Sequence, residues 1–138
     1  MATRTQKRTR VKKLVQNQVL PLTRKYKTTY KDIKIWFKHL NDTVFDGQLT
    51  PFNDIQIKHI KDKQFVWGQV VIKDQKRKGT RQYILEMLPY YDTKKEFVDT
   101  LAHECVHLYQ MSNLGDTGNH DAVFYSYGKK VNQIGLQL

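Results

Sequence analysis

Apolar side chains recur at helical spacing between residues 30 and 46. They fall three or four positions apart in one stripe: Ile33, Trp36, Phe37, Leu40, Val44 and Phe45. Such a stripe is typical of an amphipathic helix that buries one face. Thr29 and Asp32 have the spacing of a capping box, and Gly47 is suited to a left-handed turn after the last helical residue. We therefore predict a helix over residues 30–46.

Three strand-like runs follow Pro51. They are IQIKHI at residues 55–60, FVWGQVVI at residues 65–72, and a run over residues 81–88 in which apolar and polar positions alternate. Their β-branched and aromatic residues favour strands, and Pro89 ends the third run. Gly68, inside the second run, indicates either a bulge or a close approach of another part of the backbone.

Residues 93–111 predict a second helix. Thr93 and Glu96 have capping-box spacing, and the apolar stripe that follows is formed by Phe97, Leu101, Cys105 and Leu108. A glycine-containing loop over residues 113–119 leads to a last helix, in which Gly128 argues against one unbroken element. This order of elements predicts one small α+β domain with a three-stranded sheet.

The N-terminal residues follow a different pattern. Residues 1–13 are almost entirely Thr, Gln, Lys and Arg, so we expect them to be disordered unless bound to a partner. Residues 14–28 could form a short helix that ends before Pro21. We accordingly divide the chain into a basic, flexible N-terminal arm at residues 1–28 and a folded domain at residues 29–138.

The positive charge is concentrated in that arm. The formal net charge is +11, yet residues 1–31 hold ten Lys and Arg and no acidic residue, whereas the remainder holds fourteen basic and thirteen acidic residues. A segregated cationic segment favours a polyanionic partner, with nucleic acid the first candidate. Tyr26, among basic neighbours, could stack on a base. The alternative is a solvated tail that aids solubility.

Composition narrows the class of protein. A chain of 138 residues that is 39% hydrophobic can bury one core. The single cysteine, Cys105, excludes an internal disulfide and any zinc ribbon built from cysteine pairs, and we interpret it as a buried apolar residue. No run has the length of a membrane span, and no apolar signal-peptide region follows the basic start. We expect a cytoplasmic protein without a membrane partner; the oligomeric state stays open.

The strongest chemical signal is His103-Glu104-Cys105-Val106-His107, which reads H-E-x-x-H. Residues four apart on a helix share a face, so both imidazoles can point at one metal ion while Glu104 reaches a water bound there. This arrangement is typical of zinc hydrolases. The alternative is a pair of partly buried histidines satisfied by hydrogen bonds. His39 and His59 are interpreted as surface residues.

A catalytic zinc ion usually takes three protein ligands. His120 is the first candidate for the third, because it is a nitrogen ligand at the expected start of the last helix; Asp121 and Asp116 are the alternatives. Glu104 would be the general base of peptide hydrolysis. A second donor to the oxyanion is not identified, because Tyr109, Tyr125 and Tyr127 are more simply explained as core residues.

Four segments together resemble a known family, the SprT-like (Spartan-type) zinc metalloproteases. They are LNDTVFDGQLTP (residues 40–51), FVWGQVVI, FVDTLAHECVHLYQ (97–110) and NHDAVF (119–124). The resemblance covers about residues 30–135. It implies a zincin-like fold, zinc held by His103, His107 and His120, Glu104 as the catalytic acid and base, and a protease of DNA-bound proteins with a role in DNA repair.

The chain departs from the family pattern in two places. Asp121 stands where the family usually has glycine, which keeps an aspartate ligand open. The C-terminal zinc ribbon of many members is absent, so contacts with DNA would come from the N-terminal arm. Two other hypotheses remain: a non-catalytic nucleic-acid-binding protein with a structural zinc, and a zincin directed at one specific partner protein.

Overall fold

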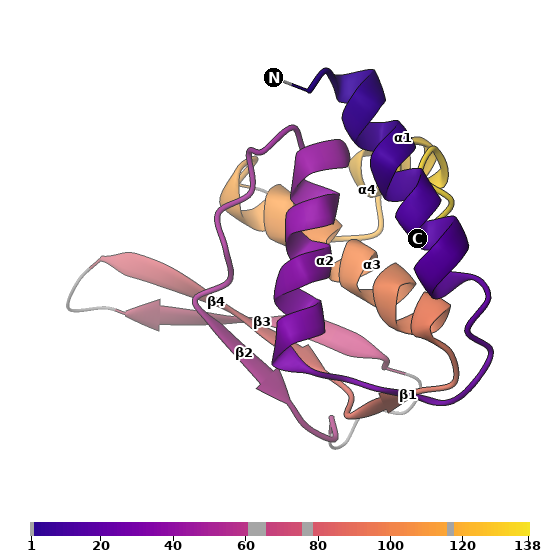
Figure 1. Cartoon of the computed structure of the whole chain (residues 1–138). Coiled ribbons are helices and arrows are strands. Elements are labelled where there is room, and N and C mark those ends of the chain that lie inside the picture. Colours follow the sequence, from indigo (N-terminus) through magenta and orange to yellow (C-terminus); the bar gives the residue numbers. More distant parts are fainter. Residues whose placement is uncertain (1, 61–65, 76–78, 116–117) are drawn as a thin grey trace.

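The computed structural model describes residues 2–60, 66–75, 79–115 and 118–138 (Figure 1). The start of the second predicted strand at Phe65 and the candidate ligand Asp116 therefore lie outside the described residues. The helices are α1 (Arg4–Leu14), a π-helical turn η1 (Val15–Val19), α2 (Tyr30–Thr43), α3 (Lys94–Ser112) and α4 (Ala122–Asn132). None of the described helices is both long and apolar enough to cross a membrane.

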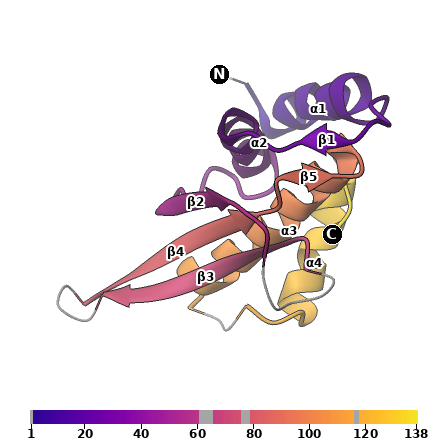
Figure 2. The ribbon, with the colours of Figure 1, turned by 90° about the horizontal axis from the view of Figure 1, so that it is seen from below.

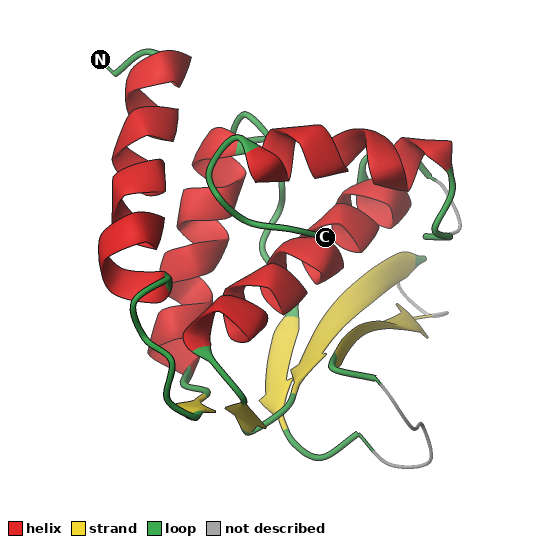
Figure 3. Cartoon of the chain, turned by 90° about the vertical axis from the view of Figure 1, so that its right-hand side faces the viewer, coloured by secondary structure: helices red, strands yellow, loops and turns green. Residues whose placement is uncertain are grey.

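The sheet has the order β2-β4-β3. Strand β2 (Asp54–Ile57) runs parallel to β4 (Thr80–Met87), and β3 (Gly68–Gln75) runs antiparallel to β4. A separate antiparallel pair joins β1 (Tyr26–Lys27) to β5 (Tyr90–Tyr91), as Figure 2 shows. The helices gather on one side of the three-stranded sheet (Figure 3). The prediction of an α+β domain with three main strands is confirmed.

Two predicted elements end earlier than expected. Strand β2 stops at Ile57, which pairs with Met87, the last residue of β4. Strand β4 cannot continue through Pro89, because proline has no amide hydrogen to donate to a neighbouring strand. Helix α2 ends at Thr43 rather than residue 46. Gly47 does adopt the expected left-handed conformation, with φ +76°.

Helix α3 is the central element of the fold. It packs against α2, β3 and α4, and the Thr93 side chain caps it by accepting a hydrogen bond from the backbone N–H of Glu96. Its fully buried apolar residues include the predicted stripe: Phe97, Val98, Leu101, Ala102, Cys105, Val106 and Leu108. The predicted cap and core face are therefore confirmed, and α3 is held on several sides.

Gly68 lets the edge strand approach α3 closely. A Cβ atom at this position would lie 2.9 Å from Cγ2 of Thr100 and 3.2 Å from Sδ of Met87. The pairing of β3 with β4 is continuous from Gly68 to Gln75, so there is no bulge. Of the two roles predicted for this glycine, the structure confirms the close approach.

The N-terminal segment is ordered, contrary to prediction. Thr3 and Gln6 form a capping box at the start of α1, and Val11, Val15 and Val19 are buried in the core. Helix α1 packs against α2. The predicted disorder of residues 1–13 is wrong because Val11 belongs to an apolar stripe that continues past residue 13.

Two further predictions concern where a helix ends and where a helix is interrupted. The helical segment does stop before Pro21, since η1 ends at Val19. Helix α4 continues unbroken through Gly128, contrary to the interruption considered. The division of the chain at residue 28 stays a prediction.

Replacing Val15 with alanine tests whether the N-terminal segment belongs to the core. The side chain is fully buried, and a Cβ atom at Gly135 would lie 3.4 Å from its Cγ1. We expect Val15→Ala to lower the free energy of unfolding by about 2 kcal/mol, since the substitution leaves a cavity. The neighbouring exposed Gln16, changed to alanine, is the control. Equal midpoints of urea unfolding for both variants would contradict the observed packing.

Candidate metal centre

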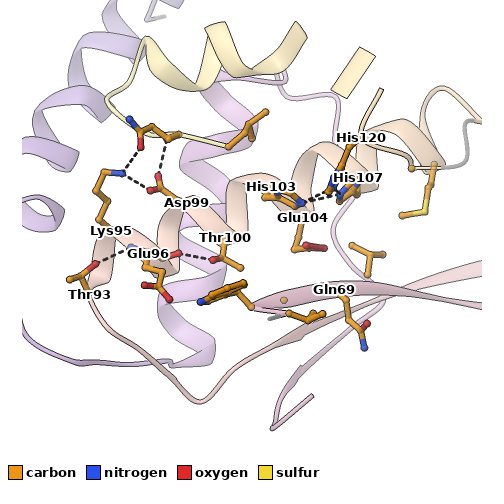
Figure 4. Close-up of a pocket in the computed structure, with 18 of the residues that line it drawn as sticks. Gln69, Thr93, Lys95, Glu96, Asp99, Thr100, His103, Glu104, His107 and His120 are labelled. Atoms are coloured by element: carbon orange, nitrogen blue, oxygen red, sulfur yellow. Dashed lines mark hydrogen bonds and ion pairs between the residues drawn. The ribbon is translucent and has the colours of Figure 1, made fainter. Parts of the chain in front are cut away.

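Three histidine side chains converge at one point (Figure 4). His103 and His107 lie one turn apart on α3, and His120 comes from the segment before α4. The Nε2 atom of each ring lies 3.1 Å from the Nε2 atoms of the other two. Among the described residues these three form the one group whose ligand atoms could hold a metal ion. The structure thus brings His120 to the motif.

The spacing of the three nitrogens fits a metal ion better than a set of hydrogen bonds. A neutral imidazole has one N–H, which donates along the plane of its ring, so three Nε2 atoms facing one another cannot all be satisfied mutually. Nitrogen ligands at about 2.0–2.1 Å from a tetrahedral zinc ion lie about 3.3 Å apart. The observed triangle is close to that value.

The protonation state of the two α3 histidines also suits metal binding. Burial, followed by the neighbouring histidines, lowers the pKa of His103 to about 4. Burial also lowers the pKa of His107. Both rings are therefore neutral near pH 7, which is the form that ligates metal ions.

Glu104 lies beside this group and is almost completely buried, with 4% of its surface exposed. Burial raises the pKa of its carboxyl group to about 8. A carboxyl group with a pKa near neutrality can both accept and return a proton at physiological pH. A bound cation nearby would favour the ionised form.

A cavity of about 1090 Å³ opens beside the histidines. Edge strand β3 forms one wall through Gly68, Gln69, Val70 and Ile72, and α3 forms the other through Thr100, His103, Glu104 and His107. Gln137 and Leu138 also line it. The cavity is large enough for several residues of an extended peptide, and both candidate ligands of α3 face it together with Glu104.

Asp121, the alternative ligand, has a different role in the structure. Its Oδ1 atom accepts a hydrogen bond from the backbone N–H of Phe124 and caps α4. The same atom accepts a second bond, of 3.3 Å, from the side-chain amide of Gln110. Asp121 is not part of the three-histidine group.

Sequence reasoning missed Gln110. Its side chain is completely buried, and its Oε1 atom lies 3.0 Å from Nδ1 of His107. The signal available was its position three residues after His107, which places both on one face of the helix. A glutamine within an otherwise apolar turn of the helix indicates a buried side chain that needs hydrogen-bond partners.

The predicted burial of the other histidines and of the three tyrosines is confirmed at some positions and wrong at others. His59 is exposed, as predicted, whereas His39 is half-buried, with its ring 5.1 Å from that of Trp36. Burial lowers the pKa of His39. Tyr109 and Tyr127 pack on Phe45 as core residues, but Tyr125 is 63% exposed, so its predicted core role is wrong. These three tyrosines are not among the described residues that line the cavity.

In a comparison with protein families, the model of the SprT-like family matches residues 33–138. The matched region includes α3, the three histidines and the strands of the main sheet. The comparison with curated proteins finds no match, and neither does the comparison with solved structures.

Proposed function

The chain belongs to the SprT-like family, and from this premise we propose that it is a zinc-dependent endopeptidase. The observation that carries the proposal is the group of three Nε2 atoms, each 3.1 Å from the others, beside a buried glutamate in an open cavity. We propose that His103, His107 and His120 hold the zinc ion. Neutral nitrogen ligands with an open side favour zinc over calcium or magnesium.

When bound, zinc supplies Lewis acidity to a water molecule and to the carbonyl group of the scissile peptide bond. The chain itself would move the proton. Glu104 is next to His103 in the sequence and lines the same cavity. In this proposal its carboxylate accepts a proton from the attacking water and delivers it to the departing amine. Only 4% of the surface of Glu104 is exposed, which limits the access of bulk water to its carboxylate.

Edge strand β3 is the proposed binding surface for the substrate. It pairs with β4 on one side, and its other side borders the cavity. An extended peptide could add to such an edge through main-chain hydrogen bonds, which depend little on the substrate's side chains. Gly68 supports this arrangement because it allows β3 to lie close to Thr100 of α3. This mode of binding suits protein substrates of varied sequence.

We further propose that the substrates are proteins associated with or crosslinked to DNA, in the setting of DNA repair and in the cytoplasm. The support is the charge of α1, which holds six basic residues and no acidic ones: Arg4, Lys7, Arg8, Arg10, Lys12 and Lys13. Within the described contacts Arg4 pairs with Asp46. Positive charge of this density favours phosphate contacts.

The position of α1 adds to this proposal. Figure 3 shows α1 on the other side of α3 from the sheet, whereas β3 and the cavity lie on the sheet side. A phosphate backbone held on α1 would therefore leave the cavity free for a protein substrate. The competing function is a non-catalytic nucleic-acid-binding protein in which the metal only stabilises the fold.

Glu104→Gln distinguishes the enzyme from that alternative. The change keeps the size of the side chain and all three histidines but removes the base. We expect zinc content to stay at the wild-type level while cleavage of an unfolded protein substrate falls by about 10²–10⁴-fold. Both are measured on the same zinc-loaded preparations, with DNA present and absent. Unchanged cleavage in the variant, or no cleavage by the wild type in either condition, would contradict the proposed reaction.

Neutralising exposed charges on α1 tests the contact with DNA. Arg10, Lys12 and Lys13 are exposed, and their joint change to glutamine spares the buried valines. We expect the slope of log K against log salt concentration for DNA binding to become shallower by about 0.9 for each phosphate that α1 no longer neutralises. The matched control changes Lys73, Lys129 and Lys130, which are exposed on β3 and α4. Equal slopes for the two triple variants would refute a phosphate-binding α1.

A further inference from the structure

Gln110 is a buried polar side chain that makes three contacts. It has no exposed surface. Its amide group contacts Nδ1 of His107 at 3.0 Å, the backbone carbonyl of Asn119 at 3.0 Å and Oδ1 of Asp121 at 3.3 Å. Burying an amide is unfavourable unless its donors and acceptor are used. Here both ends of the group have partners.

The partners fix the orientation of the amide. The carbonyl of Asn119 and the carboxylate of Asp121 can only accept, so the NH₂ group of Gln110 must face them. Its Oε1 atom then faces His107 and can only accept a hydrogen bond from Nδ1–H. In a neutral imidazole this leaves the lone pair on Nε2. That is the atom of His107 that points toward His103 and His120.

The same amide joins α3 to the segment that carries His120. Asn119 and Asp121 flank His120 in the sequence, so a donor shared between them restrains the backbone on both sides of it. Oδ1 of Asp121 also accepts from Phe124 at the start of α4. Just before this segment, a Cβ atom at Gly118 would lie 3.3 Å from the Met111 side chain, so this part of the loop also lies close against α3.

We propose that Gln110 is the positioning residue of the metal centre: it selects the metal-binding tautomer of His107 and sets the position of His120. The inference rests on the proposed function, because it assigns Gln110 a role toward the zinc ion held by the three histidines. Gln110 does not touch the reacting atoms. It acts through two of the three ligands, as the outer partners of metal-binding histidines generally do.

Neither close substitute can reproduce both roles. Glutamate can accept from Nδ1–H of His107 but has no donor for the carbonyl of Asn119 and adds repulsion against Asp121. Methionine has a similar length yet can supply neither a strong acceptor nor a donor, so His107 is free to change tautomer. Gln110→Glu therefore separates the two roles, and Gln110→Met removes both.

The first experiment measures the tautomer directly. Nitrogen-15 NMR of the metal-free wild-type protein at about pH 8, where the imidazole is neutral, reports which ring nitrogen of His107 carries the proton. We expect protonated Nδ1 in the wild type and in Gln110→Glu, and a mixture of tautomers in Gln110→Met. Protonated Nε2 as the main form in the wild type would overturn the proposal, and this result does not depend on any variant folding.

The second experiment measures zinc affinity by competition with a chromophoric chelator. We expect Gln110→Met to bind zinc about 10–100-fold more weakly than the wild type, and Gln110→Glu to be weakened as well because His120 is no longer held. Tyr83→Phe is the matched control: it removes a hydrogen bond to the carbonyl of Met111, the neighbour of Gln110, without touching a histidine.

Three outcomes are separable. Wild-type affinity in both Gln110 variants would overturn the positioning role while leaving the proposed function intact. Equal weakening in Tyr83→Phe would also overturn it, since any disturbance of the end of α3 would then suffice. A wild-type protein that binds no zinc would instead refute the proposed function.

Discussion

Three imidazole nitrogens that face one another at 3.1 Å impose the constraint on which the rest of the structure depends. Lone pairs directed at one point repel unless a cation lies between them, so the packing of the chain itself must hold the rings together. The fold meets this demand by burying α3 against α2, β3 and α4. A helix restrained on several sides presents His103 and His107 in a fixed direction.

The third ring needs a separate restraint because it comes from a loop. Asp121, directly after His120, is the N-cap of α4, and the hydrogen bond that it accepts from the backbone N–H of Phe124 fixes where the helix starts. Phe124 in turn packs against all three imidazole rings, with centroid separations of 4.8, 4.8 and 4.6 Å. The three histidines thus pack against the apolar ring of Phe124, and His107 also has a hydrogen bond with Gln110. Burial lowers the pKa of His103 and His107, so these two rings are neutral near pH 7.

The sequence was informative wherever the chemistry is local. Capping residues such as Thr93, the period of the α3 stripe and the four-residue spacing of His103 and His107 follow from helix geometry alone, and the structure has them as predicted. The sequence was less informative where the structure of a segment depends on contacts with residues far away in the chain. The N-terminal segment is held in part by Val15 of η1, which lies near Gly135. Gln110 acquires its role from Asn119 and Asp121, which only the folded chain brings near.

The most direct test of the proposed metal centre is to measure whether zinc binding depends on His120 or on Asp121. The zinc-to-protein ratio, measured by mass spectrometry after gel filtration, should be close to one for the wild type. His120→Ala should lose most of the metal, whereas Asp121→Asn should keep it, because the remaining side-chain oxygen can still cap α4. Retention of zinc in His120→Ala together with its loss in Asp121→Asn would contradict the three-histidine site.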